Sequence, residues 1–140
     1  MVYRTKLPSA ASVANYQSDG RLFAPAAARN ANSIVELVKR IAPKSGQALE
    51  IASGTGQHIV QLAKSLPNLT WSPSDVDANR LKSILVWMED TALPNIKAPH
   101  HLDATEEGWA DTVAPHDFIL LVNLLLSLIH ISEPTRRVLI

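Results

Sequence analysis

Apolar residues recur at helical spacing in three stretches of the chain. Ile34, Leu37, Val38 and Ile41 fall at positions i, i+3, i+4 and i+7, which predicts a helix. The same spacing predicts two further helices, whose apolar positions are Ile59, Leu62, Ala63 and Leu66 in one and Leu81, Ile84, Leu85 and Met88 in the other. We expect Asp77 to cap the last of these helices.

Short apolar runs alternate with the predicted helices and have the length of strands. The runs cover residues 48–52, 69–72, 96–102 and 117–123. The third is the weakest candidate because Pro99 interrupts it. This alternation predicts an α/β fold, in which a parallel sheet of about four strands carries helices on both faces. Residues 1–20 look irregular, so we place the folded domain in residues 21–125.

A glycine-rich turn joins the first predicted strand to the second predicted helix. Residues 49–58 read Leu-Glu-Ile-Ala-Ser-Gly-Thr-Gly-Gln-His. Gly54 and Gly56 suit a tight bend, because glycine takes positive φ freely and lets a ligand approach the backbone without a Cβ in the way. Open α/β sheets bind nucleotide-like cofactors at such a turn.

Polar residues also stand at the ends of the other predicted strands. Asp75, Asp103 and Asn123 follow the second, third and fourth strands. The carboxyl ends of parallel strands meet at one edge of the sheet, where ligands bind, so we expect these residues to converge on the glycine turn. Asp75 lies about 20 residues beyond the glycines, the distance at which a carboxylate accepts the hydroxyls of a ribose.

Two kinds of cofactor use this layout, and the glycines help to separate them. A dinucleotide site has three glycines in the pattern G-x-G-x-x-G, but here the third position is Ile59. An S-adenosylmethionine site has an acid at the strand end followed by G-x-G, which Glu50, Gly54 and Gly56 supply. The pattern favours S-adenosylmethionine, with an NAD(P)-binding Rossmann reductase and a non-catalytic nucleotide-binding module as alternatives.

Composition narrows the choice of compartment and partner. Thirteen basic residues balance thirteen acidic ones, so no overall field attracts nucleic acid or an anionic membrane. The chain has no cysteine, which excludes disulfides and thiolate metal sites, and we expect no metal. We expect a cytoplasmic location, because residues 1–11 lack the apolar core of a secretory signal. The apolar run of residues 118–131 is too short to span a membrane.

Three segments carry a resemblance to a known family. They are residues 23–30, 49–58 and 66–75, and the resemblance runs from about Arg21 to Asn123. These segments resemble the methyltransferase-like 26 family, formerly called the DUF938 domain. The resemblance implies a Rossmann-like class I methyltransferase fold of seven strands and S-adenosylmethionine as cofactor. The methyl acceptor stays unknown, with a small molecule favoured, and the oligomeric state stays open.

The resemblance also implies roles for single residues. Glu50 would lie near the methionine amino group, Asp75 would hold the ribose hydroxyls and Asp103 would lie beside the adenine amino group. Arg29 would neutralise the cofactor carboxylate, and Asn123 would stand where many such enzymes contact the acceptor. The whole turn is assigned to the cofactor, namely Ala52, Ser53, Gly54, Thr55, Gly56, Gln57 and His58.

Some of these positions have ordinary structural explanations. His58 acts either as a base or only as the start of a helix with a local hydrogen bond. No strong base is required, because methyl transfer is an in-line displacement that depends mainly on alignment. We expect Trp71 and Trp87 to be packing residues.

The last segment of the chain departs from the family. It begins at Leu126, ends at Ile140 and resembles the translation of a sequencing-library adapter. We therefore expect residues 126–140 to be non-native and the methyltransferase domain to be truncated in its acceptor half. In that case the fourth strand would be an exposed apolar edge of the sheet.

Overall fold

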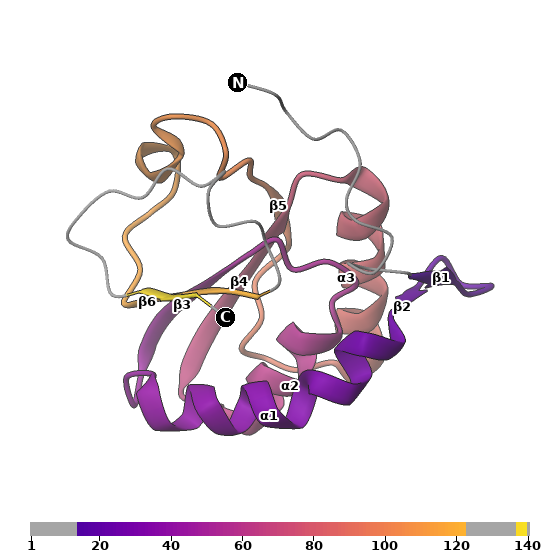
Figure 1. Cartoon of the computed structure of the whole chain (residues 1–140), viewed down its shortest axis with the longest axis horizontal. Helices are drawn as coiled ribbons and strands as arrows, with labels where there is room; N and C mark the ends of the chain where they lie inside the picture. The colour runs from indigo at the N-terminus through magenta and orange to yellow at the C-terminus, as the bar shows by residue number, and fades with distance from the viewer. Residues whose placement is uncertain (1–13, 123–136, 140) are drawn as a thin grey trace.

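A computed structural model describes residues 14–122 and 137–139. A parallel sheet with helices against it makes up most of this part of the chain (Figure 1). The elements are β1 (Asn15–Tyr16), β2 (Leu22–Phe23), α1 (Pro25–Ile41), β3 (Gly46–Ile51), α2 (Gln57–Ser65), β4 (Leu69–Asp75), α3 (Ala78–Thr91), β5 (His100–His101), the 3-10 helix η1 (Trp109–Thr112), β6 (Phe118–Leu121) and β7 (Arg137–Leu139).

The main sheet has the strand order β5-β4-β3-β6-β7, and every neighbouring pair is parallel. The chain builds β4 and β5 on one side of β3 and then crosses to place β6 on the other. This reversal next to β3 is a topological switch point, outside which open α/β sheets bind their ligands. The small β1–β2 hairpin is antiparallel and lies apart from this sheet.

The two faces of the sheet have different covers. Helices α1, α2 and α3 bury Ile34, Ile59 and Ile84 against strand residues such as Trp71 and Phe118. The opposite face buries a second cluster under the segment that contains η1, with members Leu49, Ile51, Leu102, Ala104, Trp109, Ile119 and Leu121. Figure 1 shows α1 and α2 below the sheet and η1 on the other side. The predicted α/β fold is confirmed, with a 3-10 helix as the helical element of the second face.

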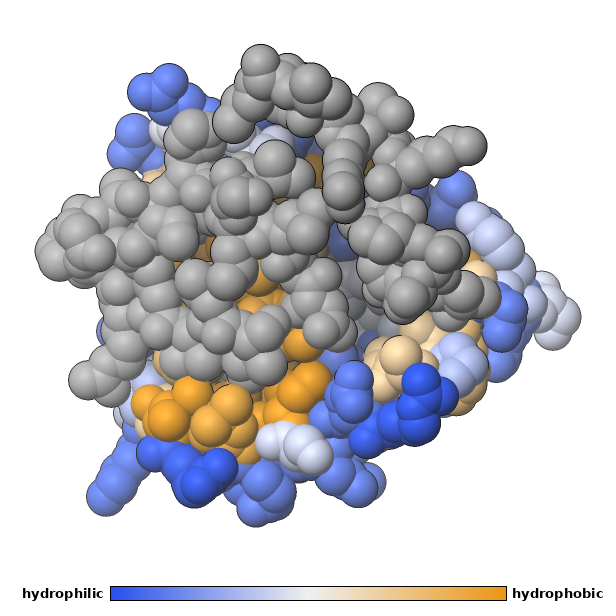
Figure 2. All heavy atoms as spheres, viewed as in Figure 1, coloured by the Kyte–Doolittle hydropathy of each residue, from blue (hydrophilic) through white to orange (hydrophobic). Residues whose placement is uncertain are grey.

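The predicted helices are amphipathic, as their spacing indicated. On α1, Val38 is fully buried while Lys39 and Arg40 are exposed. In Figure 2 hydrophilic residues line the lower rim of the molecule, where α1 lies, and apolar residues gather just above them. On α3, Leu85 was predicted to lie on the buried side of the helix together with Ile84. This prediction is wrong for Leu85, which is 42% exposed, whereas Ile84 is fully buried in the core.

Two strand predictions need correction. The run of residues 96–102 forms only the two-residue strand β5 and an isolated bridge between Trp71 and Ile96, since Pro99 has no N–H to donate to a continuous ladder. The fourth predicted strand is not a free edge, because β6 pairs in parallel with β7. Strand β7 lies within the segment expected to be non-native, an expectation that the structure does not test.

Candidate cofactor site at the carboxyl ends of β3 and β4

The turn after β3 has a left-handed backbone at three positions. Ala52, Gly54 and Gly56 have φ values of 55°, 63° and 97°. The positive φ predicted at both glycines is confirmed. No sequence pattern indicated a positive φ at Ala52, where an L side chain makes this conformation costly. The turn is anchored to β4 through Ser53, whose N–H donates to the Ser74 carbonyl at 2.8 Å and whose Oγ accepts from the Ser74 N–H at 3.1 Å.

The two glycines of the turn meet different surroundings. A Cβ added to Gly56 would lie 2.9 Å from the Cα of Ile84, so α3 packs directly on the backbone at this point. Among the described residues, chain neighbours aside, no atom would lie within 4 Å of a Cβ added to Gly54. The backbone of Gly54 is therefore open to an approaching ligand, while Gly56 is required for packing.

Asp75 stands at the end of β4 and ties the turn to the next loop. Its side chain is almost fully buried, with 1% exposure of the residue. Oδ2 accepts from the Gly54 N–H at 2.9 Å, and Oδ1 accepts from the Asp77 N–H at 3.0 Å. Each carboxylate oxygen can accept more than one hydrogen bond, so these contacts leave acceptor capacity for hydroxyl groups.

Glu50 is the one carboxyl group of the described residues that is buried without a partner for one of its oxygens. The residue is 2% exposed, and Oε1 has no hydrogen bond. Burial raises the pKa of Glu50 from its usual 4.5 to about 8, and the charge of Asp75 adds to this rise, while a hydrogen bond from Ser53 opposes it. An unpartnered buried polar atom is costly, which makes Glu50 a candidate for contact with a cationic ligand.

Gln57 and His58 contact the start of α1 and the residue before it. The Gln57 side chain accepts from the Ala24 N–H at 2.7 Å and from the Thr55 hydroxyl at 2.8 Å, and it donates to the Ala24 carbonyl at 3.4 Å. His58 Nε2 lies 3.2 Å from the Ala27 carbonyl, and burial lowers the pKa of this histidine. Both side chains therefore have structural partners on α1 and the residue before it.

The other predicted site residues make no hydrogen bond to the turn within the described part of the chain, or they lie outside that part. Asp103 follows β5, and its Oδ1 accepts from the Thr105 N–H at 2.9 Å and from the Thr105 hydroxyl. Arg29 is exposed on α1. Asn123 lies outside the described residues, so its predicted position is not described. Asp77 caps α3, as predicted, by accepting from the N–H groups of Asn79 and Arg80.

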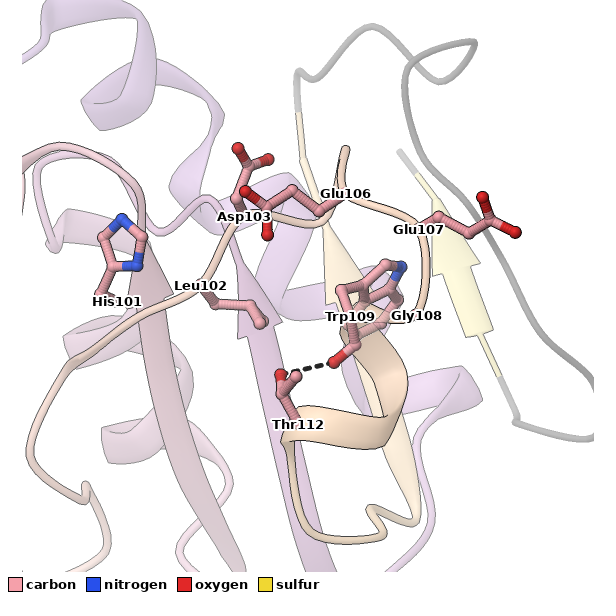
Figure 3. A pocket seen from close by; sticks show the side chains of 8 residues that line it. All are labelled: His101, Leu102, Asp103, Glu106, Glu107, Gly108, Trp109 and Thr112. Atoms are coloured by element: carbon pink, nitrogen blue, oxygen red, sulfur yellow. Dashed lines mark hydrogen bonds between the residues drawn. The ribbon is translucent and has the colours of Figure 1, made fainter.

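Asp103 also lines a cavity of about 220 Å³ between β5 and η1. The lining residues are His101, Leu102, Asp103, Glu106, Glu107, Gly108, Trp109 and Thr112. Figure 3 shows Glu107 pointing away from Asp103, and the Thr112 hydroxyl donating to the Trp109 carbonyl at 2.6 Å. Ala52 packs against the apolar cluster that contains Leu102 and Trp109, so the start of the turn and the base of this cavity share one core.

Sequence reasoning missed the residues that support the turn from behind. Ser83, on α3, is fully buried and donates to the Thr55 carbonyl at 2.6 Å. The only sequence signal was a serine between apolar positions of a predicted helix, which is too common to indicate a role. Trp71 and Trp87 are packing residues, as expected: Trp71 is fully buried in the core, and Trp87 packs against it.

Residues 14–122 and 137–139 lack two features of other protein classes. None of the helices there is both long enough and apolar enough to cross a membrane. That same part of the chain holds no group of three or more His, Cys, Asp or Glu residues suited to a metal ion.

Comparison with solved structures shows the fold family. Coclaurine N-methyltransferase, solved with N-methylheliamine and SAH (S-adenosylhomocysteine), matches with a TM-score of 0.55 and 17% identity over 65% of this chain and 26% of that chain. A protein of Methanococcus maripaludis described as S-adenosyl-L-methionine-dependent methyltransferase matches with a TM-score of 0.55 and 20% identity over 67% of this chain and 42% of its own.

A third structure, the S-adenosylmethionine-dependent methyltransferase SibL in its apo form, has a TM-score of 0.57 and 18% identity over 71% of this chain and 27% of that chain. The chain thus spans less than half the length of each of these three structures. At such identities the likeness concerns the fold alone, and it confirms a Rossmann-like class I methyltransferase fold.

The family itself is shown by a match along most of the sequence. The family described as "Protein of unknown function (DUF938)" matches residues 21–138, which include the turn, Asp75 and Asp103. The chain therefore belongs to the DUF938 family.

Proposed function

We propose that this chain binds S-adenosylmethionine at the carboxyl ends of β3 and β4 and forms the cofactor half of a methyltransferase. The observation that carries the proposal is Glu50, a buried carboxyl group with an unpartnered Oε1 beside a turn whose Gly54 backbone is open. A ligand with an ammonium group and a ribose matches these groups, because Glu50 pairs with the cation and Asp75 accepts from the hydroxyls. The three methyltransferase structures of the same fold support this choice.

The proposed contacts follow the shape of the site. Glu50 binds the methionine amino group, and the open backbone at Gly54 passes under the methionine and ribose. Asp103 lies beside the adenine amino group. Arg29, exposed on α1, supplies a cation for the cofactor carboxylate. Asn123 contacts the methyl acceptor, for which we favour a small molecule.

Methyl transfer requires these side chains mainly to position the cofactor. When bound, S-adenosylmethionine supplies an already activated methyl group. The chain's residues orient the cofactor and exclude water around Glu50, and such alignment accounts for much of the acceleration of an in-line displacement. His58 is not needed as a base in this proposal, since its ring contacts the Ala27 carbonyl.

A dinucleotide fits the turn less well. The third glycine of a dinucleotide fingerprint allows close packing of helix on strand, and Ile59 occupies that position here. Ile59 is fully buried in the core between α2 and the sheet. The space that the fingerprint keeps free is therefore filled.

Calorimetry with S-adenosylhomocysteine and NADH tests the proposal. We expect S-adenosylhomocysteine to bind and NADH to bind more weakly or not at all. Glu50→Gln removes the carboxyl group that would ionise to pair with the ammonium group of the ligand, so it should weaken S-adenosylhomocysteine binding by about 10-fold or more, whereas Glu89→Gln on the exposed side of α3 should leave it unchanged. Tighter binding of NADH, or equal affinity of the Glu50→Gln variant, would overturn the assignment.

A further inference from the structure

Ser83 connects the glycine turn to residues 21–24, called the N-terminal segment below, through one hydroxyl group. Its Oγ donates to the Thr55 carbonyl at 2.6 Å and accepts from the Leu22 N–H at 2.8 Å. The residue is 0% exposed, so water cannot replace either bond. Thr55 lies between the two glycines of the turn. Removal of this hydroxyl would leave two buried backbone groups unpaired, which is costly.

Gln57 makes a second connection between the same two parts of the chain. Its Oε1 accepts from both the Ala24 N–H and the Thr55 hydroxyl, and that hydroxyl in turn accepts from the Gln57 N–H at 3.2 Å. Ala24, the residue before α1, is itself buried. Thr55 is thus held through its carbonyl by Ser83 and through its side chain by Gln57.

Residues 21–24 are also fastened by contacts of Trp87 and Arg21 that include no hydrogen bond to the turn among the described residues. The Trp87 indole N–H donates to the Leu22 carbonyl at 3.0 Å, and the Arg21 guanidinium lies 4.5 Å from the centre of the Trp87 ring. Arg21 also pairs with Asp19 at 3.2 Å and with Asp90 at 3.3 Å. These contacts hold residues 21–24 against α3.

We infer that Ser83 and Gln57 are positioning residues that make cofactor binding at the glycine turn depend on the docking of residues 21–24. This inference rests on the proposed function, because it concerns the affinity of that site for its cofactor. The coupling is reciprocal: a segment that stabilises the binding-competent turn is itself stabilised when the cofactor binds. If residues 21–24 had only a structural role, undocking them would lower the stability of the protein, but it would not change the affinity for the cofactor, and cofactor binding would not stabilise their docking.

The first test compares Ser83→Ala with Thr91→Ala. Thr91 lies on the same helix, and within the described part of the chain its hydroxyl bonds only to the α3 carbonyls of Trp87 and Met88. At a temperature where circular dichroism shows both variants folded, Ser83→Ala should bind S-adenosylhomocysteine about 5- to 50-fold more weakly than the wild type. The Thr91→Ala variant should stay within about twofold.

Arg21→Ala gives a second test that does not disturb the core. Among the described residues Arg21 makes no hydrogen bond or ion pair with the turn, so a site without coupling would keep its affinity in this variant. We expect a loss of about 2- to 10-fold, because the segment undocks more often. This variant also covers the case in which Ser83→Ala fails to fold.

Amide hydrogen exchange measures the same coupling from the other side. Addition of S-adenosylhomocysteine should slow exchange at Leu22 and Ala24, whose N–H groups donate to Ser83 and Gln57. Unchanged exchange there, together with wild-type affinity in both variants, overturns the inference and leaves the proposed function standing. Failure of the wild type to bind S-adenosylhomocysteine overturns the proposed function instead.

If the wild type does not bind S-adenosylhomocysteine, amide hydrogen exchange in the ligand-free protein decides whether the turn and residues 21–24 are coupled. Faster exchange at Gly54 and Gly56 in Ser83→Ala than in Thr91→Ala supports the coupling. Equal exchange overturns it.

Discussion

The glycine turn has two sides that differ in how completely their groups are satisfied. On the side of α3 and residues 21–24, the Thr55 carbonyl and hydroxyl are both bonded and Gly56 lies against Ile84. On the side of the strand ends, Gly54 faces open space and one oxygen of Glu50 has no partner. Within the turn itself, groups that are paired or packed and groups that are open therefore lie a few residues apart along the chain, although Arg21 Nε on the supporting side is also buried without a hydrogen bond.

This difference separates residues that maintain the fold from residues that are available to a ligand. Buried polar groups are normally paired, and an unpaired one at a sheet's carboxyl edge marks a place where stability is given up for binding. Substitutions on the two sides should therefore differ in how they combine stability and affinity. Those behind the turn should lower stability, with affinity falling as a consequence, and those in front of it should lower affinity with little loss of stability or even a gain.

The largest effect is expected for Glu50→Gln. The folded-state pKa of Glu50, about 8, is above its usual 4.5, so between these values the folded protein keeps a proton that the unfolded chain has lost. The free energy of unfolding of the wild type therefore falls as pH rises through this window. Glu50→Gln has no such proton, so at pH 9 it should be more stable than the wild type by about 3–5 kcal/mol.

Urea denaturation at pH 5 and pH 9 checks this expectation. At pH 5 the two proteins should differ little, because the Glu50 carboxyl is then mostly neutral in the folded state. Glu89→Gln serves as the control, since Glu89 is exposed. The free energy of unfolding of the wild type should fall between pH 5 and pH 9 relative to that of Glu50→Gln. If it does not fall, Glu50 is charged in the empty site.

Gly56→Ala should have the next largest effect, and on stability. The added Cβ meets the backbone of Ile84 at 2.9 Å, and φ is 97°, so both overpacking and strain oppose the change. We expect a loss of about 2–4 kcal/mol in the free energy of unfolding. Gly108→Ala is the matched control, because Gly108 has a similar φ of 79° but its nearest atom is Asp111 Oδ2 at 3.9 Å. Equal losses in the two variants would contradict the packing role of Gly56.

Asp75→Ala should act mainly on binding. Loss of hydrogen bonds to a charged group predicts that S-adenosylhomocysteine binding weakens by about 1.5–3 kcal/mol, measured by calorimetry. Asp77→Ala is the control, since Asp77 caps α3 and its loss should lower thermal stability without a comparable change in affinity. Unchanged affinity in Asp75→Ala would exclude the assignment of Asp75 to the ribose.

Gly54→Ala should be the mildest change to the fold. No atom lies near the added Cβ, so only the strain of φ at 63° applies, and we expect a loss of about 1–2 kcal/mol in stability. The methyl group would occupy the space proposed for the ligand, so affinity for S-adenosylhomocysteine should fall more than stability does. Calorimetry that finds wild-type affinity would place the ligand elsewhere.

The sequence predicted the side of the turn that faces a ligand better than the side that supports it. Glu50, Gly54 and Asp75 follow strands whose apolar runs are plain, and parallel strands bring their ends together by necessity. The support depends on Ser83 and on Leu22, which lie 61 positions apart in the sequence. No local pattern encodes a hydrogen bond over such a distance.

Local errors in the prediction had similar causes. Leu85 and Ile84 are both apolar neighbours on α3, and only the placement of that helix over β4 decides which is buried. Ala52, with its positive φ, precedes Ser53, which bonds to Ser74 of β4, a contact 21 positions away that no local pattern predicts. Residues with local causes, such as the cap at Asp77, were predicted correctly.

The positions of the three tryptophans give the protein its own fluorescent reporters. Trp71 is fully buried, with its ring edge-on to Phe118 at 6.3 Å, so its emission follows unfolding of the core. Trp87 is covered by Arg21 and bonded to Leu22, so its emission follows release of the N-terminal segment. Trp109 lies beside the cavity that Asp103 lines. Comparison of three variants that each keep one tryptophan would therefore let fluorescence distinguish local opening from global unfolding.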